Sequence, residues 1–185
     1  MSGQEFRDYI ERLILAAGEV QEDSIRQTIN LLRNLSNGTV YVIGNGGSAA
    51  IASHFATDLF RVFEVIKSTN KVLSLVDNTP LLLASGNDFG FESIFERQLA
   101  KLGREKDVLI AISSSGNSQN ILNAIHAAKE MGMTTIGLSG FDGGKLLNRV
   151  DISIYVKTNV GEYQIVEDVH SSICHFISKS VGDLV

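Results

Sequence analysis

Cysteine, clustered basic residues and long apolar runs are scarce or missing in this sequence, and each absence excludes a class of protein. Cys174 is the one cysteine among 185 residues, so an intramolecular disulfide cannot form. No apolar run approaches the about 20 residues that a membrane-spanning helix needs. The first residues lack the basic start and apolar core of a secretory leader. We therefore expect a cytoplasmic protein that does not contact a membrane.

The charge balance argues against partners with extended phosphate backbones. The formal net charge is −5, and no run of Lys and Arg is present to attract nucleic acid or an anionic membrane surface. A small anion held locally remains compatible with this balance. The hydrophobic content of 44% is ample for a buried core, and the length suits one domain over residues 1–185.

Alternating strand and helix patterns predict an α/β fold, with a five-stranded parallel sheet sandwiched by helices. The runs expected as strands are 39–43, 71–76, 107–112, 134–138 and 151–156. The segments expected as helices are 49–60, 79–85, 92–102, 121–128 and 162–181. Pro80 is expected to open the second of these helices, and a polar loop is expected at 86–90. Right-handed crossovers between parallel strands place helices on both faces of such a sheet.

A helical preface over residues 1–36 precedes the α/β core of residues 37–185. Two amphipathic helices are expected within 5–36, with a break near 21–23. An α/β core does not require such a preface. We therefore expect its apolar faces either to pack between subunits of an oligomer or to pack back on the same domain.

A serine-rich loop follows the central strand and leads into a helix. Its residues include Gly116 and the hydroxyl side chains of Ser113, Ser114, Ser115 and Ser118. Backbone N–H groups at a helix start carry partial positive charge, and hydroxyl groups add donors without bulk. The loop therefore predicts an anion site, with a polar turn capped by Ser118 as the alternative. The loop has no lysine, so a nucleotide P-loop is excluded.

A second turn from strand to helix, the glycine loop, consists of residues 44–48 with the sequence GNGGS. It lacks the GxGxxG spacing of a dinucleotide site, so we expect no nucleotide cofactor. Ligands of parallel sheets gather at the carboxyl ends of strands, which both loops follow. Asn87 and Asp88 reach the same edge if their short helix folds back over the sheet.

Two helices carry ionisable side chains that can act together. His54 and Asp58 share one helix face, where they can bind a metal, act as a base and its orienting partner, or form a surface ion pair. On the last helix, Glu167 and His175 lie about 12 Å apart along the axis. One copy can scarcely bring both to one ion, so a shared site would need two subunits. His170, in the same apolar helix, is expected to be a core residue.

Five motifs occur in an order that is typical of one family. They are the glycine loop followed by Ser53-His54-Phe55-Ala56, then Gly86-Asn87-Asp88-Phe89-Gly90-Phe91, Ile112-Ser-Ser-Ser-Gly-Asn-Ser118, Gly140-Phe-Asp-Gly-Gly-Lys145, and a final helix carrying His175. Over nearly the whole chain they resemble the bacterial phosphoheptose isomerases of the sugar isomerase (SIS) domain superfamily. The resemblance implies a flavodoxin-like three-layer fold and a homotetramer with active sites between subunits.

The resemblance also implies an activity and the residues that carry it. Members of the family interconvert sedoheptulose 7-phosphate and D-glycero-D-manno-heptose 7-phosphate, an aldose–ketose isomerisation. By position, the phosphate cradle would be Ser113, Ser114, Ser115 and Ser118. The residues implied to hold the sugar are Asn45, Gly46, Gly47, Asn87 and Asp88, together with Asp58 and Glu167. The implied ligands of a zinc ion are His54, Asp58, Glu167 and His175, and the implied acid/base pair is Asp58 and His175.

The sequence departs from the family at this site. The family normally has glutamate where this chain has Asp58, and glutamine where it has Glu167; Val62 replaces a basic residue, with Arg61 one position early. Aspartate withdraws the carboxylate by about 1.5 Å, and a shift of about 1 Å can cost on the order of a hundredfold in rate. Glutamate adds a negative charge that should tighten a divalent cation and weaken its polarisation of a carbonyl. The two changes together indicate a retuned metal site.

Two other functions are compatible with the sequence. One is a non-catalytic SIS-domain regulator that binds a sugar phosphate or a protein; such regulators generally lose the loop glycines or the histidines, which this chain keeps. The other is an isomerase for a different phosphosugar, which would fit the changes at Asp58 and Glu167. Turnover of a substrate panel would separate the three.

Overall fold

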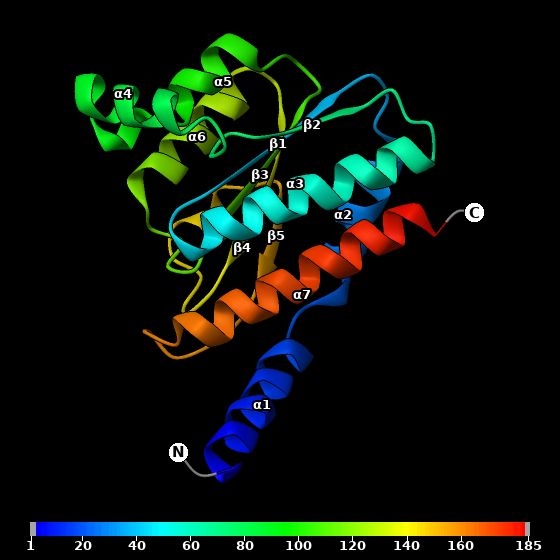
Figure 1. The fold of residues 1–185 in the computed structure, drawn as a ribbon, viewed down its shortest axis with the longest axis vertical. Helices are drawn as coiled ribbons and strands as arrows, with labels where there is room; N and C mark the ends of the chain where they lie inside the picture. The colour runs from blue at the N-terminus through cyan, green and yellow to red at the C-terminus, as the bar shows by residue number, and fades with distance from the viewer. Residues whose placement is uncertain (1–2, 184–185) are drawn as a thin grey trace.

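One five-stranded sheet, in which all neighbouring strands are parallel, organises the chain (Figure 1). The computed structural model describes residues 3–183. Across the sheet, the strands are β2 (Lys71–Ser74), β1 (Thr39–Gly44), β3 (Val108–Ser113), β4 (Thr134–Ser139) and β5 (Ile152–Tyr155). The predicted fold class and its five strands are confirmed. The order of winding reverses between β1 and β3, and parallel sheets bind ligands at the carboxyl ends of strands at such a point.

Helices cover both faces of the sheet. The first layer contains α2 (Glu22–Asn34), α3 (Gly47–Val65) and α7 (Tyr163–Gly182). The second contains α4 (Thr79–Phe89), α5 (Glu96–Leu102) and α6 (Gln119–Glu130), with the short 3₁₀ turns η1 (Phe91–Ser93) and η2 (Leu146–Asn148). Figure 1 shows α3 and α7 side by side in front of the sheet, and α4, α5 and α6 on its other side.

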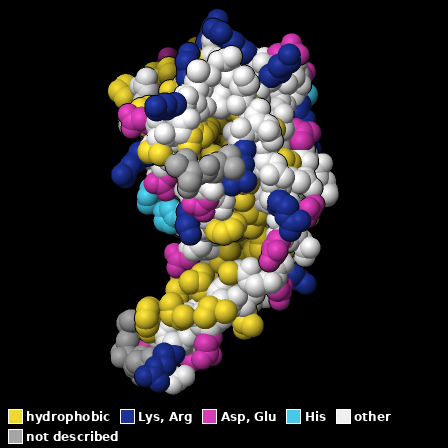
Figure 2. Space-filling model, turned by 90° about the vertical axis from the view of Figure 1, so that its right-hand side faces the viewer, with side chains coloured by type: hydrophobic (Ala, Val, Ile, Leu, Met, Phe, Trp, Pro, Cys, Tyr) yellow, Lys and Arg dark blue, Asp and Glu magenta, His cyan; other side chains and the backbone are white. Residues whose placement is uncertain are grey.

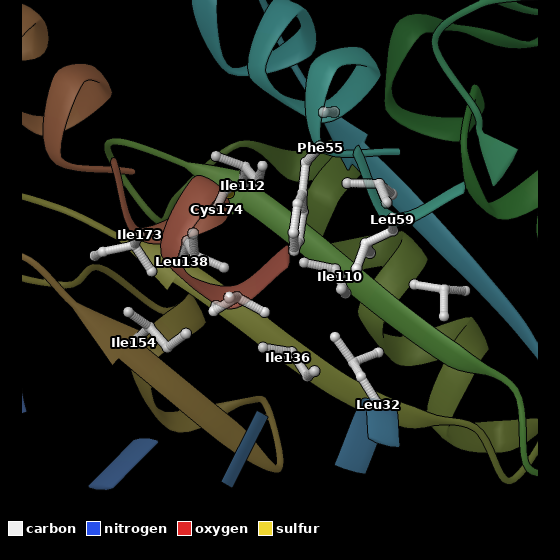
Figure 3. Close-up of a cluster of buried hydrophobic side chains, with 14 of the residues drawn as sticks. Leu32, Phe55, Leu59, Ile110, Ile112, Ile136, Leu138, Ile154, Ile173 and Cys174 are labelled. Atoms are coloured by element: carbon white, nitrogen blue, oxygen red, sulfur yellow. The ribbon is translucent and has the colours of Figure 1, made fainter. Parts of the chain in front are cut away.

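The central strand explains why both layers are needed. Every residue of β3 is buried, and its side chains alternate between the two faces. Ile110 and Ile112 enter the core under α3 and α7, where Phe55 and Leu59 lie close by (Figure 3). Leu109 and Ala111 enter the core under α5 and α6. An apolar strand buried on both faces is typical of a parallel sheet.

The N-terminal helix α1 (Gly3–Gly18) extends away from the sheet and is anchored on the start of α7 (Figure 1). Tyr9 donates a hydrogen bond of 2.6 Å to the Asp168 carboxylate. Arg12 donates two, of 2.9 and 2.6 Å, to the carboxylate of Glu162. The pKa of Glu162 falls to about 2, mainly because of the hydrogen bonds from Arg12.

The helical preface packs partly on its own domain and leaves part of its apolar surface exposed. Residues of α2 lie in the core under α7. On α1, by contrast, Phe6, Ile14 and Leu15 are between 64% and 67% exposed. Figure 2 shows hydrophobic side chains gathered along the protruding helix. Packing of α2 on its own domain is thus confirmed, and packing of α1 between subunits stays a prediction.

The boundaries of several helices differ from the prediction, most of all for α3, α4 and α5. The polar loop expected at 86–90 is wrong, because α4 continues through these positions to Phe89. Asn78 caps this helix by accepting a hydrogen bond of 3.2 Å from the N–H of Leu81, and Gly90 ends the helix at φ 89°. The helix expected over 92–102 instead begins as η1, and α3 extends beyond both predicted ends of 49–60.

None of the helices in residues 3–183 combines the length and apolarity that crossing a bilayer requires.

Candidate functional site

A small polar hollow lies at the carboxyl ends of β1 and β3, where the glycine loop and the serine-rich loop meet. Its volume is about 160 Å³. It is lined by Asn45, Ser48, Ile112, Ser113, Ser114, Ser115, Ser118, Tyr163 and Glu167. The structure thus brings together all four predicted serines with Asn45 and Glu167. We call this space the serine hollow.

The hydroxyl groups of the serine hollow have different partners. Ser113 and Ser115 accept hydrogen bonds from N–H groups of their own loop, at 3.2 and 3.3 Å. Ser118 occupies the N-cap position of α6 without a side-chain capping bond, so the alternative of a purely capping role is not what the structure shows. Within residues 3–183, the buried hydroxyl of Ser114 has no hydrogen-bond partner. Because a buried polar group without a partner is costly, an oxygen atom of a ligand is a suitable partner for it.

Gly116 shapes the loop in a way that the sequence did not indicate. Its φ is +62°, and a Cβ atom would collide with the carbonyl of Gly143. Its N–H donates to the Ser113 carbonyl at 3.0 Å, so this N–H is already used within the loop. Lys145 donates its N–H to the side chain of Asn117 at 3.1 Å. The Gly140–Lys145 motif therefore braces the serine-rich loop from outside.

Glu167 reaches the serine hollow from α7 through space left by Gly47. A Cβ atom on Gly47, the first residue of α3, would collide with the Glu167 carboxylate. The carboxylate thus lies beside a helix N-terminus, whose N–H groups favour negative charge. Burial raises the pKa of Glu167, and the charge of Asp168 raises it further.

A cluster of two imidazoles and one carboxylate lies farther along α3 and α7. Asp58 contacts the Nε2 atoms of His54 at 3.8 Å and of His175 at 3.7 Å. The two imidazole rings lie 4.8 Å apart, edge to face. We call these residues the His–Asp–His cluster. Its two histidine side chains are 58% and 51% exposed, so a ligand can reach them from solvent.

The donor set of the cluster fits a divalent metal. One ligand atom from each residue can be chosen so that all lie within 4.8 Å of one another. Ligand atoms of tetrahedral zinc are about 3.4 Å apart, so small side-chain movements would bring these three onto one ion. Three protein ligands leave a fourth position for water or substrate. The neighbouring Cys174 is not available, since its side chain is buried in the core (Figure 3).

Glu167, the fourth predicted metal ligand, is not part of this cluster in the described chain. It is eight residues before His175 on α7, which corresponds to about 12 Å along the helix axis. Gly47 and Asp58 are similarly separated on α3, by about 16 Å. The serine hollow and the His–Asp–His cluster therefore occupy different places along the same pair of helices.

A larger cavity of about 640 Å³ opens on the other side of Asn45, between α3 and α4. Asn45, Gly46 and Asn87 line it, together with Ser53, Thr79 and mainly apolar side chains. Asn87 also donates a hydrogen bond of 2.8 Å to Asp88. Asp88 itself lines a separate depression between α4 and α5. The chain brings Asn87 near the predicted site and points Asp88 elsewhere.

His170 is the buried core residue that the sequence predicts. It is fully buried, and its Nε2 lies 3.2 Å from the carbonyl oxygen of Ser139. Burial lowers its pKa to about 4, which keeps the ring neutral. A neutral ring with Nε2–H as the donor satisfies the Ser139 carbonyl at the end of β4.

Three residues that line the serine hollow were not predicted as site residues, namely Ser48, Tyr163 and the last apolar residue of β3, Ile112. Ser48 is the last residue of the glycine loop, and its position at a helix start was an available signal. Tyr163 begins α7 and carried no local signal, because its place depends on how α7 packs.

Comparison with known proteins gives a consistent result. A family model described as the SIS domain matches residues 5–140. A phosphoheptose isomerase of Syntrophotalea carbinolica is 38% identical over 174 residues, which cover 93% of this chain and 86% of that protein. One of Helicobacter pylori (strain P12) is 37% identical over 180 residues, or 96% of this chain and 92% of that protein. The structure of a phosphoheptose isomerase from Francisella tularensis matches with a TM-score of 0.87 at 30% identity, covering 98% of this chain and 99% of that one.

Proposed function

The chain belongs to the SIS domain family and, within it, to the phosphoheptose isomerases, and from this premise we propose that it interconverts sedoheptulose 7-phosphate and D-glycero-D-manno-heptose 7-phosphate. The observation that carries the proposal is the presence, on one fold, of a hydroxyl-lined anion hollow and a solvent-accessible His–Asp–His cluster. The first suits a phosphate, and the second suits proton transfer and metal binding.

The serine hollow would hold the phosphate and thereby fix the reacting carbons. The hydroxyls of Ser114 and Ser118, which make no hydrogen bond within the loop, would donate to phosphate oxygens. Asn45 lies between this hollow and the larger cavity, where the carbon chain would continue past Asn87. Binding energy from the phosphate is in this way used to orient the reacting atoms.

Asp58 and His175 would supply the two proton-transfer groups. One removes the proton on the carbon next to the carbonyl, and the other moves a proton between the oxygens of a cis-enediol. His54, Asp58 and His175 would hold a zinc ion, with Glu167 of a second copy as a further ligand. The ion would contribute polarisation of the carbonyl. Asp58 and Glu167, in place of the glutamate and glutamine usual in the family, would retune this metal site.

The complete site would form between copies of the chain, in a homotetramer. Glu167 lies about 12 Å along α7 from His175, so the hollow of one copy is best completed by the cluster of another. The exposed apolar face of α1 offers a surface for such packing. We place the protein in the cytoplasm.

The proposal is tested by using NMR to monitor the conversion of sedoheptulose 7-phosphate. We expect the purified chain to form the aldose, and we expect Asp58→Ala and His175→Ala each to lose at least about a hundredfold in rate. His126→Ala is a matched control, because His126 forms an exposed pair with Glu130, four residues away, at 3.4 Å on α6. Full activity in both site variants would exclude these residues from catalysis.

Two other outcomes of the same assay would replace the proposal. Binding of sedoheptulose 7-phosphate without turnover, together with capture of a protein partner, would indicate a regulator. Turnover of a different phosphosugar alone would indicate an isomerase of another specificity.

A further inference from the structure

Asn120 joins the two loops that form the candidate site, although it lines neither the serine hollow nor the larger cavity. Its Nδ2 donates a hydrogen bond of 2.9 Å to Oδ1 of Asn45. Asn45 returns one of 2.9 Å from its own Nδ2 to Oδ1 of Asn120. This reciprocal pair connects the start of α6, after the serine-rich loop, with the glycine loop before α3. The two residues are 75 positions apart in the chain.

The side chain of Asn120 is itself held in place. It is 2% exposed, and its Oδ1 also accepts the N–H of Ile121 at 3.0 Å. That bond requires the oxygen of Asn120 to point toward the backbone of α6. Through the reciprocal pair, this orientation of Asn120 also fixes the orientation of the Asn45 amide group.

Asn45 occupies the passage between the two spaces. It is shared by the linings of the serine hollow, about 160 Å³, and the larger cavity, about 640 Å³. A side-chain amide has two N–H donors and two acceptor sites, and the pair with Asn120 uses one of each. One donor and one acceptor of Asn45 are left for a ligand that passes from one space into the other.

We infer that Asn120 is a positioning residue that fixes the amide of Asn45 to bind the hydroxylated carbon chain of a phosphosugar. The inference rests on the proposed function, since it takes the serine hollow as the phosphate end and the larger cavity as the sugar end. Inorganic phosphate would occupy only the serine hollow, where the four serines of the serine-rich loop line the space beside Asn45, so it depends on Asn45 less than a sugar phosphate does. Loss of Asn120 therefore weakens the binding of the sugar phosphate more than that of inorganic phosphate.

The experiment compares two ligands on Asn120→Leu, a neutral change of similar size that removes both bonds to Asn45. Calorimetry on the full chain measures the Kd of sedoheptulose 7-phosphate and the Kd of inorganic phosphate. We expect the first Kd to rise about tenfold and the second to change less than about twofold. Asn123→Leu is the matched control, because Asn123 lies on the same helix and donates a hydrogen bond of 3.0 Å to the carbonyl of Glu92, outside both spaces.

The ratio of the two Kd values separates positioning from general stability. If Asn120 only holds the loops together, both Kd values rise by the same factor, and the inference is overturned. An unchanged Kd for the sugar phosphate overturns it as well. Should Asn120→Leu not fold, Asn120→Ser keeps a polar group that is too short to span both bonds, and the same ratio test applies with a smaller expected rise.

The proposed function is tested separately by turnover in the unmodified chain. Binding of sedoheptulose 7-phosphate without conversion would reject isomerisation and leave the ratio test in force. An unmodified chain that binds inorganic phosphate but no phosphosugar would overturn both.

Discussion

Replacing the buried His170 should change how stability depends on pH. The folded pKa of His170 is about 4 because of burial, whereas a histidine in the unfolded chain titrates near 6.5. Below pH ~6.5 the unfolded state binds a proton that the folded state excludes, so stability is full above this pH and falls as the pH drops toward about 4. The loss from pH 7 to pH 4.5 is about 2 to 3 kcal/mol.

His170→Gln removes this titration while preserving a donor for the carbonyl of Ser139. We expect the variant to lose some stability at pH 7, and we expect its stability to fall less steeply than that of the unmodified chain between pH 6.5 and 4.5. Urea unfolding at one fixed protein concentration measures both curves, because subunit association links stability to concentration. His126→Gln is the control, since its side chain is 75% exposed. Parallel curves for His170→Gln and the unmodified chain would refute the account of a buried, neutral imidazole.

Three further predictions concern other parts of the chain. Glu162→Gln removes the ion pair with Arg12 and should cost about 0.5 to 1 kcal/mol at pH 7, since these side chains are 25% and 32% exposed. The pKa of Glu162 is about 2, so this contribution is present above pH ~4.5 and is lost as the pH falls toward 2; denaturation from pH 7 to pH 3 measures it. Gly47→Ala places a Cβ against the far end of the flexible Glu167 side chain, which can move away, so stability should change by less than about 1 kcal/mol, while the displaced carboxylate should weaken the binding of inorganic phosphate. Asp58→Asn should lower zinc affinity more than about a hundredfold, which equilibrium dialysis with metal analysis measures.

Two of these predictions have a control variant, and two have a stated result that would contradict them. Glu130→Gln should leave stability nearly unchanged, because its pair with His126 is exposed. Gly18→Ala should be harmless, since a Cβ there meets nothing within 4 Å. If Gly47→Ala binds inorganic phosphate as tightly as the unmodified chain, displacing the Glu167 carboxylate does not affect the phosphate site, and the prediction is contradicted. Equal zinc content in Asp58→Asn and the unmodified chain would remove the cluster as a metal site.

The fold could be predicted closely from the sequence because its signals are local. Apolar runs such as 108–113, buried on both faces, mark central parallel strands, and the intervening helical periodicity fixes the layers. The error at 86–90 arose because glycine, asparagine and aspartate are typical of loops. In the folded chain, a capped first turn carries α4 through them to Gly90.

The candidate site was predictable where its residues follow strand ends, as Asn45 and Ser114 do. The role of Gly116 was not, because the reason for a glycine there is the carbonyl of Gly143, which the fold brings from 27 positions away. The pairing of Asn120 with Asn45 is likewise a contact between distant segments. Helix spacing placed Glu167 away from His175, and the structure agrees.

Mixing two inactive variants tests the shared site most directly. Ser118→Asp puts a negative charge in the serine hollow while keeping a good N-cap residue, and His175→Ala disables the cluster. If the hollow of one copy works with the cluster of another, oligomers reassembled from equal amounts of the two variants contain intact sites and regain up to about a quarter of the unmodified isomerase activity. No activity in the mixture, with both variants folded and reassembled, would contradict the account.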